Sequence, residues 1–313
     1  AASAAAIIFF TLCIFMSHPG NRIGLIFAVL GAVGFSFKAI LIKLAYPYGV
    51  DAVTLLALRM GLSLPFFLAL GWADQRRRQP VPLAGRDWGL MLGLGFSGYY
   101  LASYLDFLGL QYISAALERL ILFAYPTLVV LFSAFFLGKP VTRRAAGAIG
   151  LCYAGIALAV AHDLDLAGTA TDVWVGGALV FGSAVSYALY LMGNGQAVGR
   201  LGAARVTAWA STIACVLCLA HFAATRPLAL LVQPAPVMAL AAAMALFSTV
   251  LPVWMVSEAI RRLGAGPVSL IGTLGPVVTL FLGWLILAEP IGVYQIVGGA
   301  LVVAGVVLVG RKS

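Results

Sequence analysis

The second half of this chain repeats its first half at a fixed distance along the sequence. Residues 101–160 align without a gap on residues 251–310, and eleven of the sixty aligned pairs are identical. The pairs include a proline in the middle of an apolar stretch, Pro126 in one copy and Pro276 in the other. A repeat of this length predicts two copies of one fold rather than a single continuous domain.

The composition indicates that the two copies fold in a lipid bilayer rather than in water. Hydrophobic residues make up 63% of the chain and charged residues only 9%, whereas a soluble domain is roughly a quarter charged. Crossing the hydrocarbon core takes roughly 20 residues of helix. Ten such stretches can be drawn, at 23–46, 52–72, 88–111, 113–137, 145–162, 174–194, 205–223, 237–260, 263–287 and 291–309.

An odd number of spans in each copy makes the copies cross the membrane in opposite directions. Inverted repeats of this kind are typical of secondary transporters. We therefore predict an all-α membrane protein in which ten transmembrane helices form two inverted five-helix repeats around a central cavity. The first repeat covers residues 22–162 and the second covers residues 174–310.

The basic residues between the spans predict the topology. With the N-terminus inside, one set of loops and ends holds fourteen basic residues, whereas the other set holds only Arg226. Cytoplasmic loops carry such an excess of Lys and Arg, so both termini should be cytoplasmic. The net charge of +9 is scattered between apolar stretches, which indicates topology signals and excludes a nucleic-acid partner.

Residues 1–21 form an N-terminal extension that does not fit this count. Ala4 to Met16 is apolar but too short to span a bilayer, and an eleventh span would place the N-terminus outside. Either Met16 is the true start, or the segment is a short interfacial or signal-like element. We favour the first interpretation.

Short proline motifs recur at corresponding positions of the two halves and carry a resemblance to a known family. Over about residues 22 to 310, the chain resembles the EamA-type carriers of the drug/metabolite transporter superfamily. The motifs are Tyr125-Pro126 with Gly138-Lys139-Pro140, and Gly275-Pro276 with Ala288-Glu289-Pro290.

The resemblance implies a basket of ten helices around one cavity in a bacterial inner (plasma) membrane. It also implies export of amino acids and other metabolites, and aromatic-amino-acid exporters are the best-understood type. Lys139 departs from the acidic residue usual in the family, which Glu289 matches in the second copy. That position lies in a loop, so the expected fold is unaffected.

Ionisable residues inside the spans are costly and mark candidate functional sites. All but the last of them fall in the outer half of the membrane, and the alignment pairs the acidic ones there with uncharged residues of the second copy. The scaffold is therefore duplicated but the charge is not, which favours a role in substrate or ion handling. These residues are Lys38, Lys43, Arg59, Asp106, Glu118, Arg119 and Glu258.

We assign Lys38 and Arg59 to substrate binding, and Asp106, Glu118 and Arg119 to a coupling and charge network. The excess of cations suits a substrate that carries a carboxylate or a phosphate. Glu118 is expected to pair with Arg59 or Lys38 across helices. It forms either a permanent structural salt bridge or a carboxylate that accepts a proton when the site empties.

Further candidates are aromatic or hydroxyl side chains near the middle of the spans. Tyrosines too deep for the interfacial belt need hydrogen-bond partners, which a wet cavity supplies, although core packing explains each of them equally well. Thr273 and Ser269 could bond a substrate or their own backbone. The predicted substrate-binding set is completed by Tyr100, Tyr104, Tyr125, Trp254, Ser269 and Thr273, and the predicted hinges are Pro126 and Pro276.

The remaining features are structural. Glu258 and Arg262 should form a pair on one helix face, and two glycine groups, Gly89/Gly93 and the region of Gly298, should allow close helix packing. We expect no catalytic residues, no cofactor and no metal, a monomer, and a small molecule and the lipid bilayer as the partners. The leading hypothesis is a secondary exporter, for which proton coupling is a candidate mechanism; the alternatives are a passive channel and, less favoured, an intramembrane enzyme.

Overall fold

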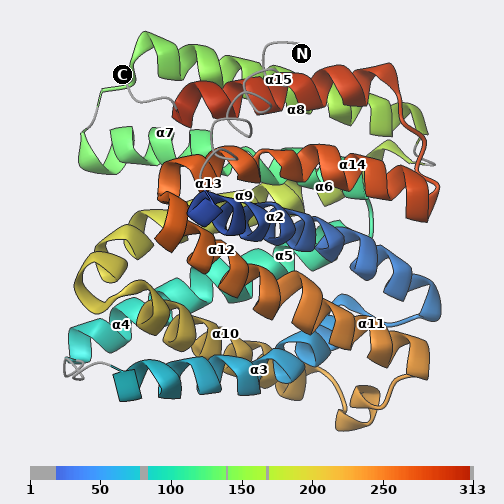
Figure 1. The fold of residues 1–313 in the computed structure, drawn as a ribbon. Helices are drawn as coiled ribbons and strands as arrows, with labels where there is room; N and C mark the ends of the chain where they lie inside the picture. Colours follow the sequence, from blue (N-terminus) through green and yellow to red (C-terminus); the bar gives the residue numbers. More distant parts are fainter. Residues whose placement is uncertain (1–18, 78–83, 139, 167–168, 311–313) are drawn as a thin grey trace.

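The computed structural model describes residues 19–77, 84–138, 140–166 and 169–310, and these residues form helices joined by short loops. Two of the elements, η2 and η4, are π-helical and two, η1 and η3, are 3₁₀ turns. Figure 1 labels the α-helices. In chain order the elements are α2 (Pro19–Ala45), η1 (Tyr46–Tyr48), α3 (Ala52–Arg77), α4 (Gly85–Leu94), η2 (Gly95–Leu101), α5 (Ala102–Gly109), α6 (Ala115–Leu122), α7 (Tyr125–Leu137), α8 (Arg143–Leu166), α9 (Ala170–Leu201), α10 (Ala203–Thr225), η3 (Leu228–Leu231), α11 (Ala235–Ala245), η4 (Leu246–Val250), α12 (Leu251–Leu263), α13 (Ala265–Gly272), α14 (Leu274–Leu287) and α15 (Val293–Gly310).

These elements form the ten predicted spans, four of which are broken. The third and eighth spans are α4–η2–α5 and α11–η4–α12, and the fourth and ninth spans are α6–α7 and α13–α14. Among the described residues, eight segments are long and apolar enough to cross a membrane, and 293–309 is a shorter apolar helix. The third span carries tyrosines and Asp106 in place of aliphatic residues. The all-α membrane fold is thus confirmed.

The repeat is visible in the backbone as well as in the sequence. The two π-helical elements lie at corresponding positions, and in each a backbone N–H bonds to the carbonyl five residues earlier. Gly138 (φ 63°) and Ala288 (φ 54°), which also correspond, both take the left-handed conformation that ends a helix. Figure 1 shows the inversion, since α2 runs from left to right and α9, which opens the second repeat, runs from right to left.

Each mid-span proline lies in the first turn of a helix that follows a break. Pro126 is the second residue of α7, and Pro276 is the third residue of α14. Proline costs no hydrogen bond there, because the first N–H groups of a helix have no intrahelical partner. A threonine hydroxyl bonds a carbonyl at each break: Thr127 donates to Ala124 at 2.7 Å and Thr273 donates to Leu270 at 2.6 Å.

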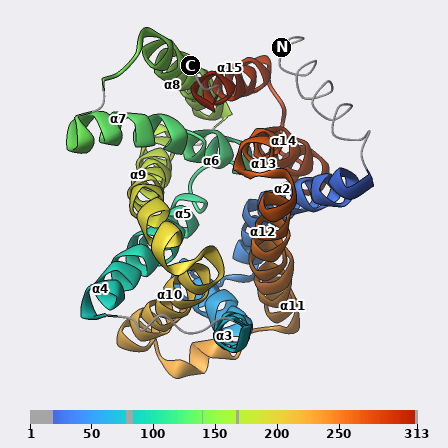
Figure 2. The same ribbon diagram turned by 60° about the vertical axis from the view of Figure 1, so that its left-hand side comes forward.

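The helices form two walls between two edge pairs (Figures 1 and 2). The first wall consists of α9, α4–α5 and α6–α7, and the second consists of α2, α11–α12 and α13–α14. Each wall therefore combines the first helix of one repeat with the third and fourth spans of the other. Helices α8 and α15 pair at one edge, and α3 and α10 pair at the other.

Glycines let the edge pair α8–α15 pack closely. A Cβ at Gly155 would lie 2.9 Å from Val302 Cγ2, and a Cβ at Gly305 would lie 2.7 Å from the carbonyl oxygen of Ala148. The predicted close packing around Gly298 is confirmed, because a Cβ there would lie 2.5 Å from the Gly155 carbonyl oxygen. The same prediction is wrong for Gly89 and Gly93, where an added Cβ meets nothing within 4 Å.

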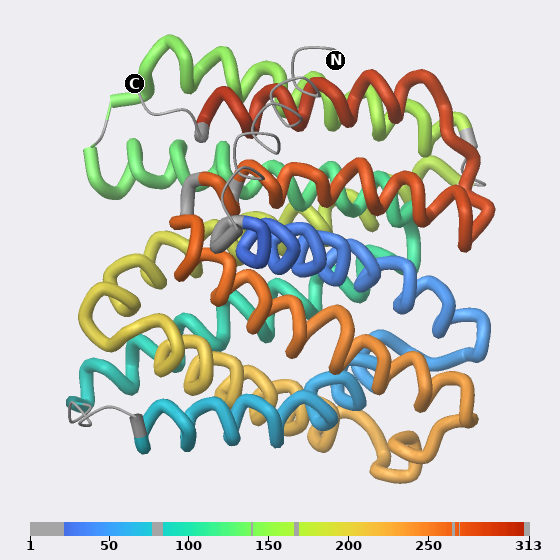
Figure 3. The backbone as a smooth tube through the Cα atoms, viewed as in Figure 1, coloured from blue at the N-terminus to red at the C-terminus, as the bar shows by residue number. Residues whose placement is uncertain are grey.

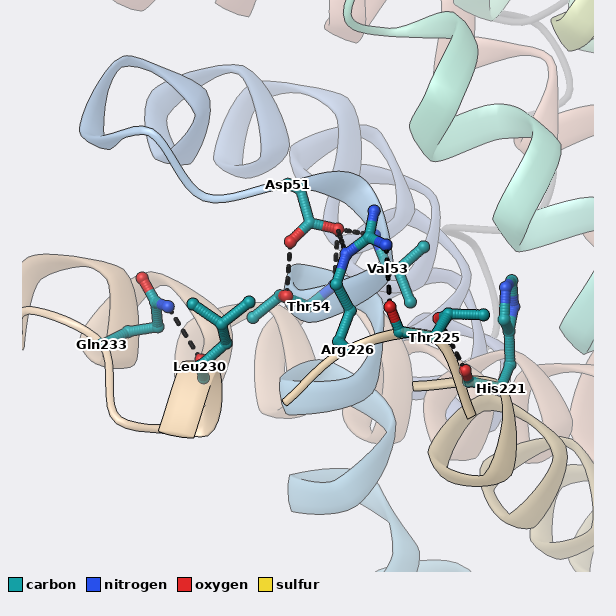
Figure 4. Close-up of polar contacts among 8 residues, drawn as sticks. All are labelled: Asp51, Val53, Thr54, His221, Thr225, Arg226, Leu230 and Gln233. Atoms are coloured by element: carbon teal, nitrogen blue, oxygen red, sulfur yellow. Dashed lines mark hydrogen bonds and ion pairs between the residues drawn. The ribbon is translucent and has the colours of Figure 1, made fainter. Parts of the chain in front are cut away.

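We call the end of the bundle that holds Asp51, Asp163 and Glu289 the acidic end, and the opposite end the basic end. At the acidic end, Asp51 caps α3 and accepts hydrogen bonds from the Val53 amide at 3.1 Å and the Thr54 hydroxyl at 2.5 Å (Figure 4). Arg226, after α10, donates to the same carboxylate at 3.2 Å. These bonds hold the Asp51 pKa below its ordinary value although partial burial opposes the shift. The single basic residue of the acidic loops is thus neutralised where it lies.

Hydrophobic packing differs between the two ends. At the acidic end, one cluster of buried side chains contains members of α2, α11 and α14 from one wall and of α5 and α6 from the other. Toward the basic end, the described residues form separate clusters, one in α4, α9 and α10 and another in α2, α12 and α13. The walls therefore share a core at the acidic end and have separate cores at the basic end.

Candidate functional site

An ion triad joins the two walls near the acidic end. The Lys38 ammonium on α2 lies 2.6 Å from Asp106 Oδ2 on α5 and 3.2 Å from Glu118 Oε1 on α6. The two carboxylate side chains are 2% and 0% exposed, and Lys38 is 17% exposed. The predicted pairing of Glu118 with Lys38 is confirmed, and the structure adds Asp106, so that two buried carboxylates share one cation.

The triad leaves acceptor capacity unused. Asp106 Oδ1 and Glu118 Oε2 are buried and accept no hydrogen bond from any described residue. Buried ionised groups are costly unless they are paired and fully hydrogen-bonded. When all three groups are ionised, the triad carries one excess negative charge, which favours the binding of a proton or a cationic group.

Arg59, on the edge helix α3, does not pair with Glu118. Its side chain is buried; its Nε–H donates to the Thr249 hydroxyl at 3.1 Å, and its guanidinium carbon lies 5.3 Å from the centre of the Phe107 ring. Asp106 is close enough to interact with it electrostatically. Thr249 was missed from the sequence, although it lies in the π-helical η4, opposite Tyr99 in the repeat alignment.

Arg119 lies next to the helix break of the opposite wall. Its guanidinium is 5.4 Å from the centre of the Phe123 ring, and a Cβ at Gly275 would lie 2.7 Å from Arg119 Nη2. The buried Arg119 Nε has no hydrogen-bond partner among the described residues. A side chain at position 275 would therefore have to displace this cation. The Gly275 carbonyl in turn accepts from the Ser36 hydroxyl at 3.2 Å.

A row of tyrosines extends from Arg119 along the first wall. Tyr125 packs edge-to-face on Tyr187 at 5.2 Å between ring centres, Tyr187 stacks on Tyr190 at 5.5 Å, and Tyr190 meets Tyr99 at 5.3 Å. The last two hydroxyls lie 3.2 Å apart. Tyr125 thus belongs to a larger aromatic surface. The sequence already shows part of it, because Tyr187 and Tyr190 are spaced i and i+3 on α9.

Tyr100 and Tyr104 lie elsewhere. Their rings stack on each other and both meet His221 of α10, and the Tyr100 hydroxyl lies 2.9 Å from His221 Nδ1. No contact joins them to the ion triad within the described residues. His221 was not among the predicted site residues, and no pattern in the sequence marked it as their partner.

The other predicted site residues are also apart from the triad. Trp254 is 51% exposed and packs edge-to-face on Phe27, and Thr273 bonds its own backbone. The side chain of Ser269 lies outside the described residues. Glu258 pairs with Arg262 at 2.7 Å, as predicted, and also with Arg261.

Acidic side chains bind the start of α6, the helix that carries Glu118. The Asp163 carboxylate accepts from the amide and the hydroxyl of Ser114, both at 3.0 Å, and Glu289 Oε1 accepts from the Ala115 amide at 2.9 Å. Burial raises the Glu289 pKa, while the hydrogen bond from Ala115 opposes the shift. Tyr46 adds a further cross-wall bond, since its hydroxyl donates to the Phe107 carbonyl. Several polar contacts thus close the acidic end.

Comparisons with known proteins agree with this arrangement. An uncharacterized transporter YcbK of Bacillus subtilis (strain 168) is 30% identical over 283 residues, which is 88% of each chain. An uncharacterized transporter YyaM of the same organism is 27% identical over 214 residues, 68% of this chain and 70% of that one. A crystal structure of a protein with 19% identity superimposes with a TM-score of 0.63 over 91% of this chain and 95% of that one, which shows the fold alone.

A family model matches the chain twice, once in each half. The matched residues are 22–161 and 174–311, which together cover most of the chain and agree with the repeat. The family consists of membrane transporters and not of enzymes. The chain therefore belongs to the EamA-like transporter family.

Proposed function

We propose that this protein is a secondary transporter that exports small metabolites by alternating access. The observation that carries the proposal is the triad of Lys38, Asp106 and Glu118, because it joins the two walls at one end of the bundle. A contact that ties mobile halves together and can change its charge is what an alternating-access carrier needs.

The packing supports an inward-facing state. The walls share one hydrophobic cluster at the acidic end, and the described side chains near the basic end divide into separate clusters. The excess of Lys and Arg in the basic loops supports a cytoplasmic location of that end. We accordingly propose a multi-pass protein of the bacterial plasma membrane with both termini cytoplasmic.

The triad suggests how export is coupled to proton entry. A proton that reaches Glu118 from outside neutralises one of the two carboxylates that attract Lys38 and weakens the contact between the walls. Loss of that proton restores the contact. Because two carboxylates share a single ammonium, one proton suffices to neutralise the triad.

The tyrosine row supports a substrate with a planar apolar part. Tyr125 and Tyr187 are partly buried and Tyr190 is buried, all in one wall, and Arg119 lies within electrostatic range of the first two. Aromatic faces beside a cation suit an aromatic ring with an anionic group. We propose amino acids, aromatic ones included, as the substrate class.

Counterflow in reconstituted vesicles tests the proposal. Vesicles loaded with one unlabelled amino acid at a time are diluted into the same labelled amino acid at a low concentration. A carrier gives a transient, saturable accumulation of label for at least one of the twenty. A flux that rises linearly with concentration supports a passive channel, and no flux for any amino acid contradicts the proposed substrate class.

A further inference from the structure

Arg59 is a buried cation without an anionic partner. Its side chain is 6% exposed, and no described carboxylate forms an ion pair with it. Its Nε–H reaches the Thr249 hydroxyl, whereas its buried Nη1 has no hydrogen-bond partner among the described residues. An arginine carries five N–H donors, so much of its capacity is unused.

Two other arginines, by contrast, have a carboxylate partner. Arg226 binds Asp51 at 3.2 Å, and Arg262 binds Glu258 at 2.7 Å. Asp106, the carboxylate that interacts electrostatically with Arg59, is already held by Lys38. Three cations (Lys38, Arg59 and Arg119) therefore face two carboxylates, which leaves one positive charge when all five are ionised.

A buried charge in this position is costly without a counterion. Its surroundings supply a cation–π contact with the Phe107 ring but no anion, since Phe107, Cys215 and Cys218 are buried and apolar. Arginine binds carboxylates in a bidentate manner through its planar fork. The missing partner is therefore an anion that comes from outside the chain.

We propose that Arg59 binds the carboxylate of the transported molecule, with Thr249 fixing the orientation of the guanidinium. The inference rests on the proposed carrier function and deepens it, because it makes one negatively charged carboxylate a requirement for binding. The bound carboxylate supplies the negative charge that Arg59 lacks. Thr249 belongs to η4 of the second wall, so the bound carboxylate also contacts the element that joins α11 to α12.

Thermal unfolding of the purified protein tests the proposal with three related probes. The probes are L-phenylalanine, 3-phenylpropionate, which lacks the amine, and phenethylamine, which lacks the carboxylate. The two acids should raise the Tm of the wild-type protein and phenethylamine should not. Arg59→Gln should remove both responses, and Arg59→Lys, which keeps the charge but not the fork, should reduce them.

The ligand-free Tm gives a second readout. Removal of an uncompensated buried charge should raise it by about 2 °C or more in Arg59→Gln. The control Arg226→Gln breaks a satisfied pair, so it should keep the response to the acids without a rise in Tm. A lower Tm in Arg59→Gln, acid responses equal to those of the wild type, or no response of the wild type to either acid would overturn the assignment.

The outcomes separate this inference from the carrier function. Arg59-dependent binding of the acids without counterflow would leave the anion site standing and refute the carrier. Saturable counterflow that Arg59→Gln leaves unchanged would support the carrier and refute the anion site.

Discussion

At the scale of single residues, we propose that the functional residues are those in which the two copies differ. Asp106 and Glu118 form the triad with Lys38, but their aligned partners are Val256 and Val268. Since the second copy folds with apolar residues at these positions, the scaffold does not require the charges. Their presence in only one copy is best explained by a task in transport.

Replacement of Glu118 by Gln should uncouple transport from the proton gradient. The variant keeps the shape of the side chain but cannot accept the proton that separates the walls. Export driven by a pH gradient should fall by about tenfold or more, which corresponds to about 1.4 kcal/mol, whereas exchange without a gradient should persist. Transport assays in vesicles with and without an imposed gradient measure both.

Glu258→Gln is the matched control. Glu258 forms its ion pairs with Arg261 and Arg262 on its own helix, and surface pairs of this kind contribute little. Gradient-driven export should stay within about twofold of the wild type. Similar losses in both variants would remove Glu118 from the coupling mechanism.

The sequence identified the ionisable residues inside the spans but only part of their contacts. It indicated Lys38 or Arg59 as the partner of Glu118, and the structure selects Lys38 and adds Asp106. In a bilayer the lipid and the protein core are both apolar, so the hydrophobic pattern does not show which way a helix is rotated. For that reason Tyr100 and Tyr104 could not be assigned to His221 in advance.

At the scale of elements, the start of α6 is held more firmly than the start of its counterpart α13. Ser114 caps α6 and is itself bound by Asp163, whereas α13 follows Gly264, which has no side chain. Firm anchoring of α6 keeps Glu118 within reach of Lys38. The asymmetry favours closure at the acidic end.

Glu289→Ala should loosen this anchor. It removes the carboxylate that accepts from the Ala115 amide, and the loss of such a cap costs about 1 kcal/mol. The Tm should fall by roughly 2–4 °C, which differential scanning fluorimetry detects. Glu258→Ala should shift the Tm less; an unchanged Tm in Glu289→Ala would show that the contact does not stabilise α6.

Helix packing at the α8–α15 edge offers a test with an internal control. Gly155→Val would drive a side chain into the Gly298 carbonyl and Val302, and overpacking of this kind costs typically 1–3 kcal/mol. Gly150→Ala, on the same helix, meets nothing within 4 Å and should be neutral or slightly stabilising. Unfolding of the two purified variants side by side measures the difference, and equal stability would contradict the predicted contact.

The spans were predictable because length and hydropathy define them, but their interruptions were only partly so. The prolines marked the breaks before α7 and α14, since proline is tolerated in a first turn. Nothing in the side chains marked η2 and η4, because a π-helical turn depends on how the backbone fits its neighbours rather than on one residue type. Close packing at Gly89 and Gly93 was wrongly predicted for a related reason, because a small residue permits close packing without requiring it.

At the scale of the whole molecule, the inverted repeat builds walls of mixed origin. Helix α2 packs with α11–α14 and α9 packs with α4–α7, so each repeat contributes to both walls. Two similar walls related by inversion can rock about a central site and expose it to each side in turn. The triad and the shared cluster close the acidic end in the structure described.

Distances between spin labels at the two ends test alternating access directly. One pair replaces the exposed Gln196 of α9 and Ile260 of α12 toward the basic end, and the other replaces Tyr112 and Val232 at the acidic end. The native Cys152, Cys215 and Cys218 are buried, and Cys13 is replaced beforehand.

Pulsed electron–electron double resonance measures the distance within each pair of labels at alkaline and at acidic pH. Acidification should shorten the distance between labels at the basic end and lengthen that at the acidic end, because protonation of the triad releases the closed end. Glu118→Gln should give the acidic-pH distances already at alkaline pH. Distances that stay constant, or that change in the same direction at both ends, would contradict proton-coupled alternating access.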